Sequence, residues 1–239
     1  MQRFWSRAEA GPARDGGHAV LLDGRPMRLP SGTHLAVPGL ALAHALAEEW
    51  QAAGGEKGRE FSLEELPLTR LVGNAIDLIA PDPAQAVATI AKYGETDLLC
   101  YRADFPPALA ARQHAAWQPL LDWAALSLDA PLSVTAGVMA VTQPPAALAA
   151  LSRAVAAHAP IALSALGLIV QGTGSLVLGL AVSHGRLGAA EAHALATLDE
   201  TFQAEEWGED EEAAARLART GADIALGERL LALARPEGP

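Results

Sequence analysis

The segment from Ile161 to Val182, IALSALGLIVQGTGSLVLGLAV, has no charged residue over a length that could span a membrane. Such a run has to be buried, either in lipid or in protein. QGTGS in its middle contributes two glycines, a glutamine and two hydroxyl side chains, which suit a break between helices in a protein core. We therefore predict two buried helices joined at QGTGS, with Ser175 as the N-cap of the second helix, and no membrane insertion.

The composition restricts the partners and the compartment. Hydrophobic residues make up 51% of the chain and charged residues 19%, which is enough apolar material for a folded core. The formal charge of −11 disfavours nucleic acids and anionic lipid surfaces and favours a basic protein patch. Cys100 is the only cysteine, so the chain cannot form an internal disulfide, and the N-terminus has no apolar export signal. We expect a cytoplasmic protein.

The first part of the chain has the pattern of a small sheet and one helix. HAVLL and RPMRL flank Asp23-Gly24, a dipeptide suited to a tight hairpin, and THLAV adds a further strand. ALAHALAEEWQAA then forms a helix that ends at Gly54-Gly55. GGEKGRE follows as a polar boundary. The predicted fold is α+β, with a small N-terminal α+β domain with an antiparallel sheet at residues 1–60 and a larger C-terminal all-α domain at 61–239.

Beyond the boundary nearly every segment has helical period. Pro119 should kink or divide a long helix at 108–128, and the β-branched segment 132–143 is predicted to be extended. The other predicted helices cover 66–80, a segment from Pro83, a short one capped by Thr96, a segment from Pro145, the two around QGTGS, 189–206, and a last one from Asp210.

Most signatures of catalysis are missing from the sequence. No two histidines have the spacing of a zinc protease, and there is no GxSxG elbow for a serine nucleophile. GTGS lacks the lysine of a phosphate loop and the strand that should precede a dinucleotide fingerprint. Cys100 lies in the apolar run LLCYR, which favours a buried inert thiol. We predict no enzyme activity, no cofactor and no metal.

LDETFQAEEWGEDEEAAAR, residues 198–216, contains eight carboxylates between Asp199 and Glu212 and no basic residue among them. Leu195, Leu198 and Phe202 form an apolar stripe that continues at Glu205 and Glu209. The stripe thus becomes acidic, which indicates that the helix leaves the core at its C-terminal end.

The end of this helix and the start of the next can be predicted from the same segment. Gly208 should end the first helix, and Asp210 should cap the next, with Glu211 and Glu212 in its first turn. Carboxylates of Glu205, Glu206 and Glu209 oppose the dipole of a helix C-terminus, so their placement needs another reason.

Seven motifs in order resemble a known family. They are RFW, LDGRPMRLP, LPLTRLVGNAID, YGETDLLCYRA, QHAAWQPLLDW, GSLVLGLAV and LDETFQAEEWGED. They are similar to those of the assembly chaperone of the F-type ATP synthase alpha subunit, the ATP-twelve family, and span nearly the whole chain. The resemblance implies an N-terminal α+β domain and a C-terminal orthogonal helical bundle. It also implies a non-enzymatic role, in which the protein holds the free alpha subunit until a beta subunit replaces the chaperone.

The resemblance also implies site residues and a compartment. Acids that flank the WG motif are implicated in the family's role, and here they are Glu205 and Asp210. We add Trp207 as an apolar anchor, with Glu206 and Glu209 beside it. A bacterial protein in the cytoplasm fits this sequence, whereas eukaryotic relatives carry a targeting extension for the mitochondrial matrix. We expect a monomer when free.

Two other functions stay open at this point. A hydrolase could use paired acids such as Glu205 and Asp210, which would require a pocket that joins them to residues of another element. A generic helical scaffold could instead carry the acids only for solubility, in which case charge changes there would have no effect.

Overall fold

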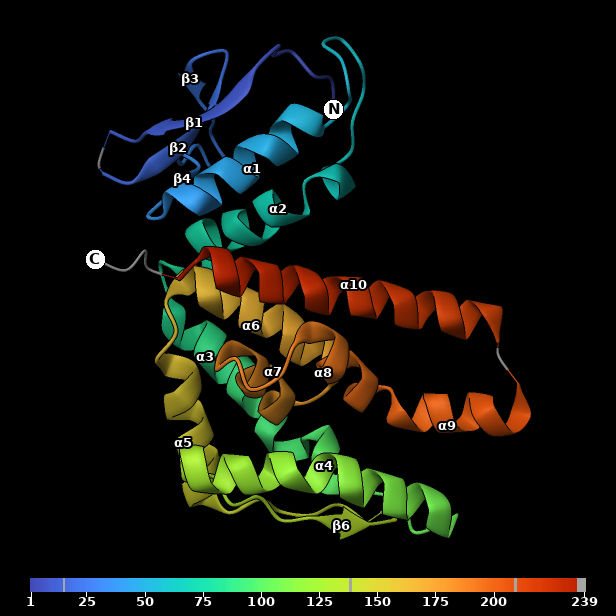
Figure 1. Cartoon of the computed structure of the whole chain (residues 1–239). Helices are drawn as coiled ribbons and strands as arrows, with labels where there is room; N and C mark the ends of the chain where they lie inside the picture. The colour runs from blue at the N-terminus through green and yellow to red at the C-terminus, as the bar shows by residue number, and fades with distance from the viewer. Residues whose placement is uncertain (15, 138, 209, 236–239) are drawn as a thin grey trace. The chain divides into compact units, whose positions relative to one another are not determined.

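A computed structural model of the chain describes residues 1–14, 16–137, 139–208 and 210–235. It contains two compact units. The first is formed by Met1–Asp82, Pro160–Ala165 and Arg229–Pro239, and the second by Pro83–Ala159 and Leu166–Glu228. An antiparallel sheet lies near the N-terminus and helices dominate the rest (Figure 1), so the predicted α+β class is confirmed. The domain boundary near residue 60 stays a prediction about independent folding.

The sheet of the first unit is built around strand β2, His18–Leu22. Strand β1, Ala8–Pro12, pairs antiparallel with the whole of β2. Strands β3, Arg25–Pro26, and β4, Ala36–Val37, also pair antiparallel with β2, β3 at its C-terminal end and β4 at its N-terminal end. The sequence did not predict β1, because AEAGP lacks the β-branched residues typical of strands. Its five-residue register with β2 makes it a strand through tertiary pairing.

The hairpin predicted at Asp23-Gly24 is confirmed. Leu22 pairs with Arg25, so the loop has two residues, and Asp23 and Gly24 have positive φ values of 49° and 77°. Both central residues therefore adopt the left-handed conformation that a tight hairpin turn requires. The Asp23 carboxylate also accepts hydrogen bonds from the amides of Ser6 and Arg7, which lower its pKa.

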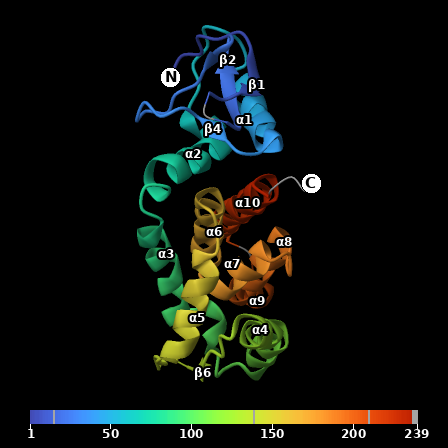
Figure 2. The same cartoon turned by 90° about the vertical axis from the view of Figure 1, so that its left-hand side faces the viewer.

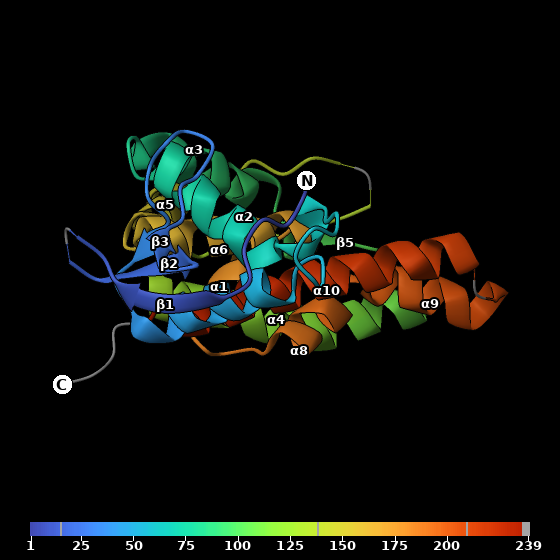
Figure 3. The ribbon, with the colours of Figure 1, turned by 90° about the horizontal axis from the view of Figure 1, so that it is seen from above.

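Helix α1, Leu40–Ala52, lies along β1 and β2 (Figure 3). Its C-terminal end is held by the buried Arg3, whose Nη1 donates to the carbonyls of Gln51, Ala53 and Gly55 at 2.8, 3.0 and 2.8 Å. A cation at a helix C-terminus satisfies free carbonyls and is attracted to the negative end of the helix dipole. The arginine of the RFW motif therefore has a structural function.

The first unit continues through the 3-10 turn η1, Leu63–Glu65, helix α2, Pro67–Asn74, and the π-helical turn η2, Ala75–Ile79. Glu49 of α1 accepts hydrogen bonds from the amides of Leu68 and Thr69 at 2.7 and 2.8 Å. These bonds satisfy two free amides at the start of α2 and tie it to α1.

The second unit is predominantly helical, and α3 lies beside α5 in it (Figure 2). Its elements are α3 (Pro83–Ala91), η3 (Lys92–Thr96), η4 (Leu98–Cys100), β5 (Tyr101–Arg102), α4 (Pro107–Leu128), β6 (Thr135–Ala136), α5 (Pro145–Ala156), α7 (Leu176–Ser183), α8 (Ala189–Ala196) and α9 (Leu198–Trp207), with parts of α6 (Pro160–Thr173) and α10 (Glu211–Leu233).

Three predictions about these elements need correction. The helix predicted at 189–206 is two helices, α8 and α9, divided at Thr197. Helix α4 continues through Pro119, so of the predicted kink or division the division does not occur. Of the segment 132–143, only Thr135–Ala136 is a strand among the residues described there, and it pairs in parallel with β5.

The uncharged run is divided as the sequence predicted. Helix α6 ends at Thr173, Gly174 has a φ of 63°, and the Ser175 side chain accepts a hydrogen bond from the Leu178 amide at 3.0 Å as the cap of α7. Gly179 in α7 lies so close to Val170 of α6 that a Cβ would overlap it. Within the described residues, no helix has both the length and the hydropathy to cross a membrane.

Candidate partner-binding site

The buried carboxylate of Asp97 joins two of the motifs found in the sequence. It accepts hydrogen bonds from the Leu99 amide at 3.0 Å, the Ser175 hydroxyl at 2.8 Å and the Val177 amide at 2.9 Å. Asp97 therefore caps η4 and also accepts from the first turn of α7, whereas the sequence predicted a cap at Thr96. Burial raises the pKa of Asp97. The N-terminus of α7, where a phosphate could bind, is occupied by a carboxylate of the chain itself.

Cys100 is buried next to this carboxylate. Desolvation, followed by the charge of Asp97, raises the pKa of the thiol to about 12. A thiol with this pKa is almost wholly protonated at neutral pH and is a poor nucleophile. The structure therefore agrees with the interpretation of Cys100 as an inert core residue. In the described part of the chain, no group of three or more histidine, cysteine or acidic side chains could hold a metal ion.

Helix α9 begins in the core of the second unit and ends in solvent. Leu198 is buried, Phe202 is half-buried, and Trp207 at the end of the helix is 80% exposed. Asp199 lies in the first turn, where the helix dipole favours a carboxylate. Gly208 follows with a φ of 93° and ends the helix, as predicted. Leu195 belongs to α8, so the predicted apolar stripe does not follow a single helix.

Three contacts hold α4 against the segment from α8 to α9. Trp117 Nε1 donates to the Leu195 carbonyl at 2.9 Å, and Gln113 Nε2 donates to Asp199 Oδ1 at 2.7 Å. Arg112, the residue before Gln113, binds Glu205, which comes six residues after Asp199. As α4 runs from 112 to 117, its partners run from 205 back to 195. The two helices are therefore antiparallel, and the N-terminal end of α4 lies near the C-terminal end of α9.

Glu205 has a partner within the chain that the sequence did not predict. Its two carboxylate oxygens accept hydrogen bonds from Arg112 Nη1 at 2.6 Å and Nη2 at 3.0 Å, which is a bidentate ion pair. These hydrogen bonds lower the pKa of Glu205 and raise the pKa of Arg112. The pair provides a reason for a carboxylate near the C-terminus of α9, although about half of the Glu205 side chain, 52%, remains exposed.

The other predicted residues lie in or next to the turn between α9 and α10. Asp210 Oδ1 accepts a hydrogen bond from the Glu212 amide at 2.9 Å, which confirms Asp210 as a capping residue. Glu206 is exposed at the end of α9, and Glu211 and Glu212 are exposed in the first turn of α10. Glu209 lies outside the described residues.

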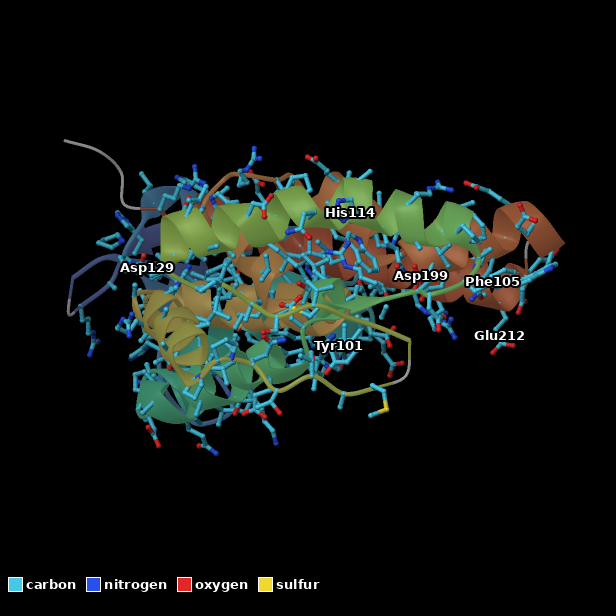
Figure 4. All side chains as sticks on the ribbon, turned by 90° about the horizontal axis from the view of Figure 1, so that it is seen from below. Tyr101, Phe105, His114, Asp129, Asp199 and Glu212 are labelled. Carbon is cyan, nitrogen blue, oxygen red and sulfur yellow. The ribbon has the colours of Figure 1, made fainter. Side chains whose placement is uncertain are left out.

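A second exposed aromatic residue lies at the same end of the second unit as Trp207. Phe105, just before α4, is 77% exposed, and the antiparallel contacts place the start of α4 near the end of α9. Figure 4 shows Phe105 and Glu212 toward one end of the unit and Asp129, at the C-terminal end of α4, toward the other. Phe105 could not be predicted as a site residue from the sequence, since no motif or periodicity distinguishes it.

The fold thus combines a small antiparallel sheet with a larger helical part, and the end of α9 exposes carboxylates beside an aromatic ring. A family model described as ATP12 chaperone protein matches residues 2–125. The crystal structure of Atp12 from Paracoccus denitrificans is similar, with a TM-score of 0.91 and 46% identity over 98% of each chain. The chain therefore belongs to the ATP12 chaperone family, a family of chaperones rather than of enzymes.

Two further relatives agree with this assignment. The crystal structure of a putative chaperone from Agrobacterium tumefaciens has a TM-score of 0.91 and 40% identity, covering 98% of this chain and 86% of the other. The mitochondrial protein atp12 of Schizosaccharomyces pombe is 27% identical over 224 residues, 89% of this chain and 76% of that protein.

Proposed function

We propose that this protein is an assembly chaperone that binds the free alpha subunit of the F-type ATP synthase. Membership in the ATP12 chaperone family supports this proposal, as does the order of the seven sequence motifs. A free subunit exposes surfaces meant for its neighbours, and such surfaces aggregate. The chaperone covers one of them until a beta subunit takes its place.

The binding surface we propose is the acidic edge, defined as Glu205, Glu206, Trp207, Glu209 and Asp210. The observation that carries this assignment is the exposure of Trp207, whose side chain extends into solvent at the end of α9 although it is the largest apolar group nearby. A tryptophan among carboxylates suits a basic patch with an apolar centre, because aromatic anchors supply binding energy and charges supply selectivity.

Release needs no ATP hydrolysis in this mechanism. A beta subunit with a larger complementary interface displaces the chaperone by affinity alone. The protein acts in the bacterial cytoplasm as a monomer, and neither a cofactor nor a metal ion takes part.

The Arg112–Glu205 pair determines how the acidic edge has to be tested. Glu205→Lys would place two cations together and disturb the contact between α4 and α9, so it cannot separate partner binding from this contact. Arg112→Gln is the matched control, because it breaks the same pair and leaves the carboxylate in place. If Glu205 acts only through Arg112, then Glu205→Gln and Arg112→Gln should have the same effect.

The experiment compares retention of the isolated alpha subunit by the immobilised wild-type protein and by five variants. We expect Trp207→Ala and Glu206→Lys to lose retention, Glu205→Gln to weaken it more than Arg112→Gln does, and Leu126→Ser to behave as wild type. Leu126 is an exposed apolar residue of α4 and serves as the control for hydrophobic loss. Equal retention by all variants with unchanged melting would show that the edge is only a solvated face.

A further inference from the structure

The first unit contains a large apolar groove, and no residue of the acidic edge lines it. Its cavity volume is about 840 Å³, and its walls come from the N-terminal residues, the β2–β3 hairpin, α1, α2 and η2. Apolar side chains from these elements form most of the lining, among them Leu22, Met27, Leu29, Trp50, Phe61 and Leu66. We call it the N-terminal groove.

The floor of the groove offers a partner little hydrogen bonding. Trp5 Nε1 already donates to the Trp50 carbonyl at 3.1 Å, and Trp50 Nε1 donates to Thr69 Oγ1 at 2.9 Å. The rings of Trp5, Trp50 and Phe61 pack against one another at centroid distances between 5.0 and 6.0 Å, which fixes their positions. A ligand on this floor therefore gains apolar contact in the main, and a sugar or nucleotide would leave its polar groups unpaired.

One face of α2 and η2 forms a side of the groove. Arg70, Asn74 and Leu78 follow at steps of four residues, Asp77 comes three residues after Asn74, and all four line the groove. Gly73 lies on the same side, where a Cβ would come within 3.2 Å of Leu29. The glycine of the LVGNAID motif thus allows α2 to approach the wall formed by Leu29.

The apolar surface continues beyond the cavity onto the rim. Phe4, Leu63 and Leu78 line the groove and are 67%, 55% and 69% exposed. Monomeric proteins seldom leave such a continuous apolar surface in water unless it has a partner. A small ligand enclosed in the cavity would not cover these three side chains, whereas a polypeptide segment that lies across the groove would.

The rim is basic, in contrast to the net charge of the chain. Arg25, Arg28 and Arg70 are exposed lining residues, against the single acid Asp77, which accepts a hydrogen bond from the Ser31 hydroxyl at 2.8 Å. None of the three arginines forms an ion pair in the part of the chain that the structure describes. Carboxylates on a bound segment would find charge partners here.

We infer that the N-terminal groove binds an apolar polypeptide segment flanked by acidic residues, supplied by the client subunit. This inference rests on the proposed chaperone function for the origin of the segment. The chaperone then holds its client at two surfaces of opposite charge: the acidic edge takes a basic patch, and the groove takes an acidic, apolar segment. Two sites that bind one client raise the affinity beyond that of either alone.

The groove can be tested with labelled peptides and fluorescence anisotropy. The probe has leucines and phenylalanines in its centre and glutamates at both ends; one control peptide has lysines at the ends, and another has serines in the centre. We expect the probe to bind at least about tenfold more tightly than either control. Equal binding of the probe and the lysine peptide, or no binding, would overturn the inference.

Variants then locate the binding. Leu78→Ser and Phe4→Ser should each weaken probe binding about tenfold or more, and Arg70→Glu should abolish the preference for glutamate. Arg59→Glu, an exposed arginine of the same unit outside the groove lining, and Leu126→Ser are the matched controls. If the controls weaken binding as much as the groove variants do, the site is elsewhere. Tighter competition by a fatty acid than by unlabelled probe would make the groove a lipid site and refute the inference.

Retention of the alpha subunit separates the two proposals. Loss of retention with Leu78→Ser and Arg70→Glu, at unchanged melting temperature, supports the groove as a client site. If these variants retain the subunit normally while Trp207→Ala does not, the groove proposal is wrong and the proposed function stands. If the wild-type protein retains no alpha subunit, the proposed function fails, and the assignment of the segment to this client fails with it.

Discussion

Replacing Asp97 should destabilise the second unit, and the expected loss follows from the three hydrogen bonds that its carboxylate accepts. In Asp97→Ala, the Leu99 amide, the Ser175 hydroxyl and the Val177 amide lose their acceptor in a fully buried site. Each orphaned donor costs about 1–3 kcal/mol, and partial relaxation leaves an expected loss of about 3–5 kcal/mol. For a chain of this length, this loss corresponds to a melting temperature lower by about 6–20 °C.

Asp97→Asn provides the sharper version of the test. The Oδ1 atom accepts from Leu99 and Ser175, and the Oδ2 atom accepts from Val177. An asparagine that keeps its oxygen at the first position retains two bonds and leaves only the Val177 amide without an acceptor. We therefore expect a loss of about 1–3 kcal/mol near pH 4, smaller than the loss in the alanine variant.

The pH dependence of this difference tests the assigned cause of the pKa shift. Burial raises the pKa of Asp97 above its ordinary value of 3.8. Between that value and the raised one, the folded state keeps a proton that the unfolded state releases, so the stability of the wild type falls as pH rises. The asparagine variant lacks this titration. The stability difference between the two proteins should therefore shrink as pH rises.

Urea unfolding followed by circular dichroism at a series of pH values measures this difference. All other titrating groups are common to both proteins, so their contributions to the pH dependence largely cancel in the stability difference. A difference that widens with rising pH would mean that the three hydrogen bonds outweigh burial and lower the pKa. That result would refute the reasoning.

Three further changes have outcomes that follow from single contacts. Arg3→Met should lower the free energy of unfolding by roughly 2–4 kcal/mol, because three carbonyls at and just after the end of α1 lose a charged donor. Denaturant unfolding measures this loss, and a loss no larger than that of a typical surface substitution would contradict the capping role of Arg3. Asp210→Ala should cost roughly 1 kcal/mol and Asp210→Asn much less, since asparagine also caps helices, and thermal melting compares the two. Cys100 should resist a thiol reagent in the native protein and react after denaturation, since burial raises its pKa to about 12; rapid native labelling would contradict this.

Features with a local cause could be predicted from the sequence. Asp23-Gly24 predicted a two-residue turn because both positions tolerate positive φ, and the structure has that turn. Ser175, Gly208 and Asp210 were assigned correctly as helix boundaries because capping depends on residues a few positions apart.

Features with a tertiary cause could not be predicted. Strand β1 exists because it pairs with β2, and nothing in AEAGP marks it as a strand. The break at Thr197 lies in an alanine-rich segment without glycine or proline, so the helical pattern continued across it. Arg112 and Glu205 are 93 positions apart, and neither sequence context signals the other. The partner-binding role of the acidic edge remains a prediction.

The first unit is built from segments that lie far apart in the sequence, and this has a consequence for the synthesis of the protein. This unit joins Met1–Asp82 to Arg229–Pro239, and a Cβ at Gly39 would lie 3.7 Å from the Leu233 carbonyl oxygen. Leu230 and Leu231, near the end of the chain, are buried. Since a ribosome delivers Leu230 and Leu231 well after Asp82, the sheet and α1 wait for residues 83–228 to be synthesised before this part of their unit is in place. A copy that stops before Leu230 therefore lacks part of the unit that contains Met1–Asp82.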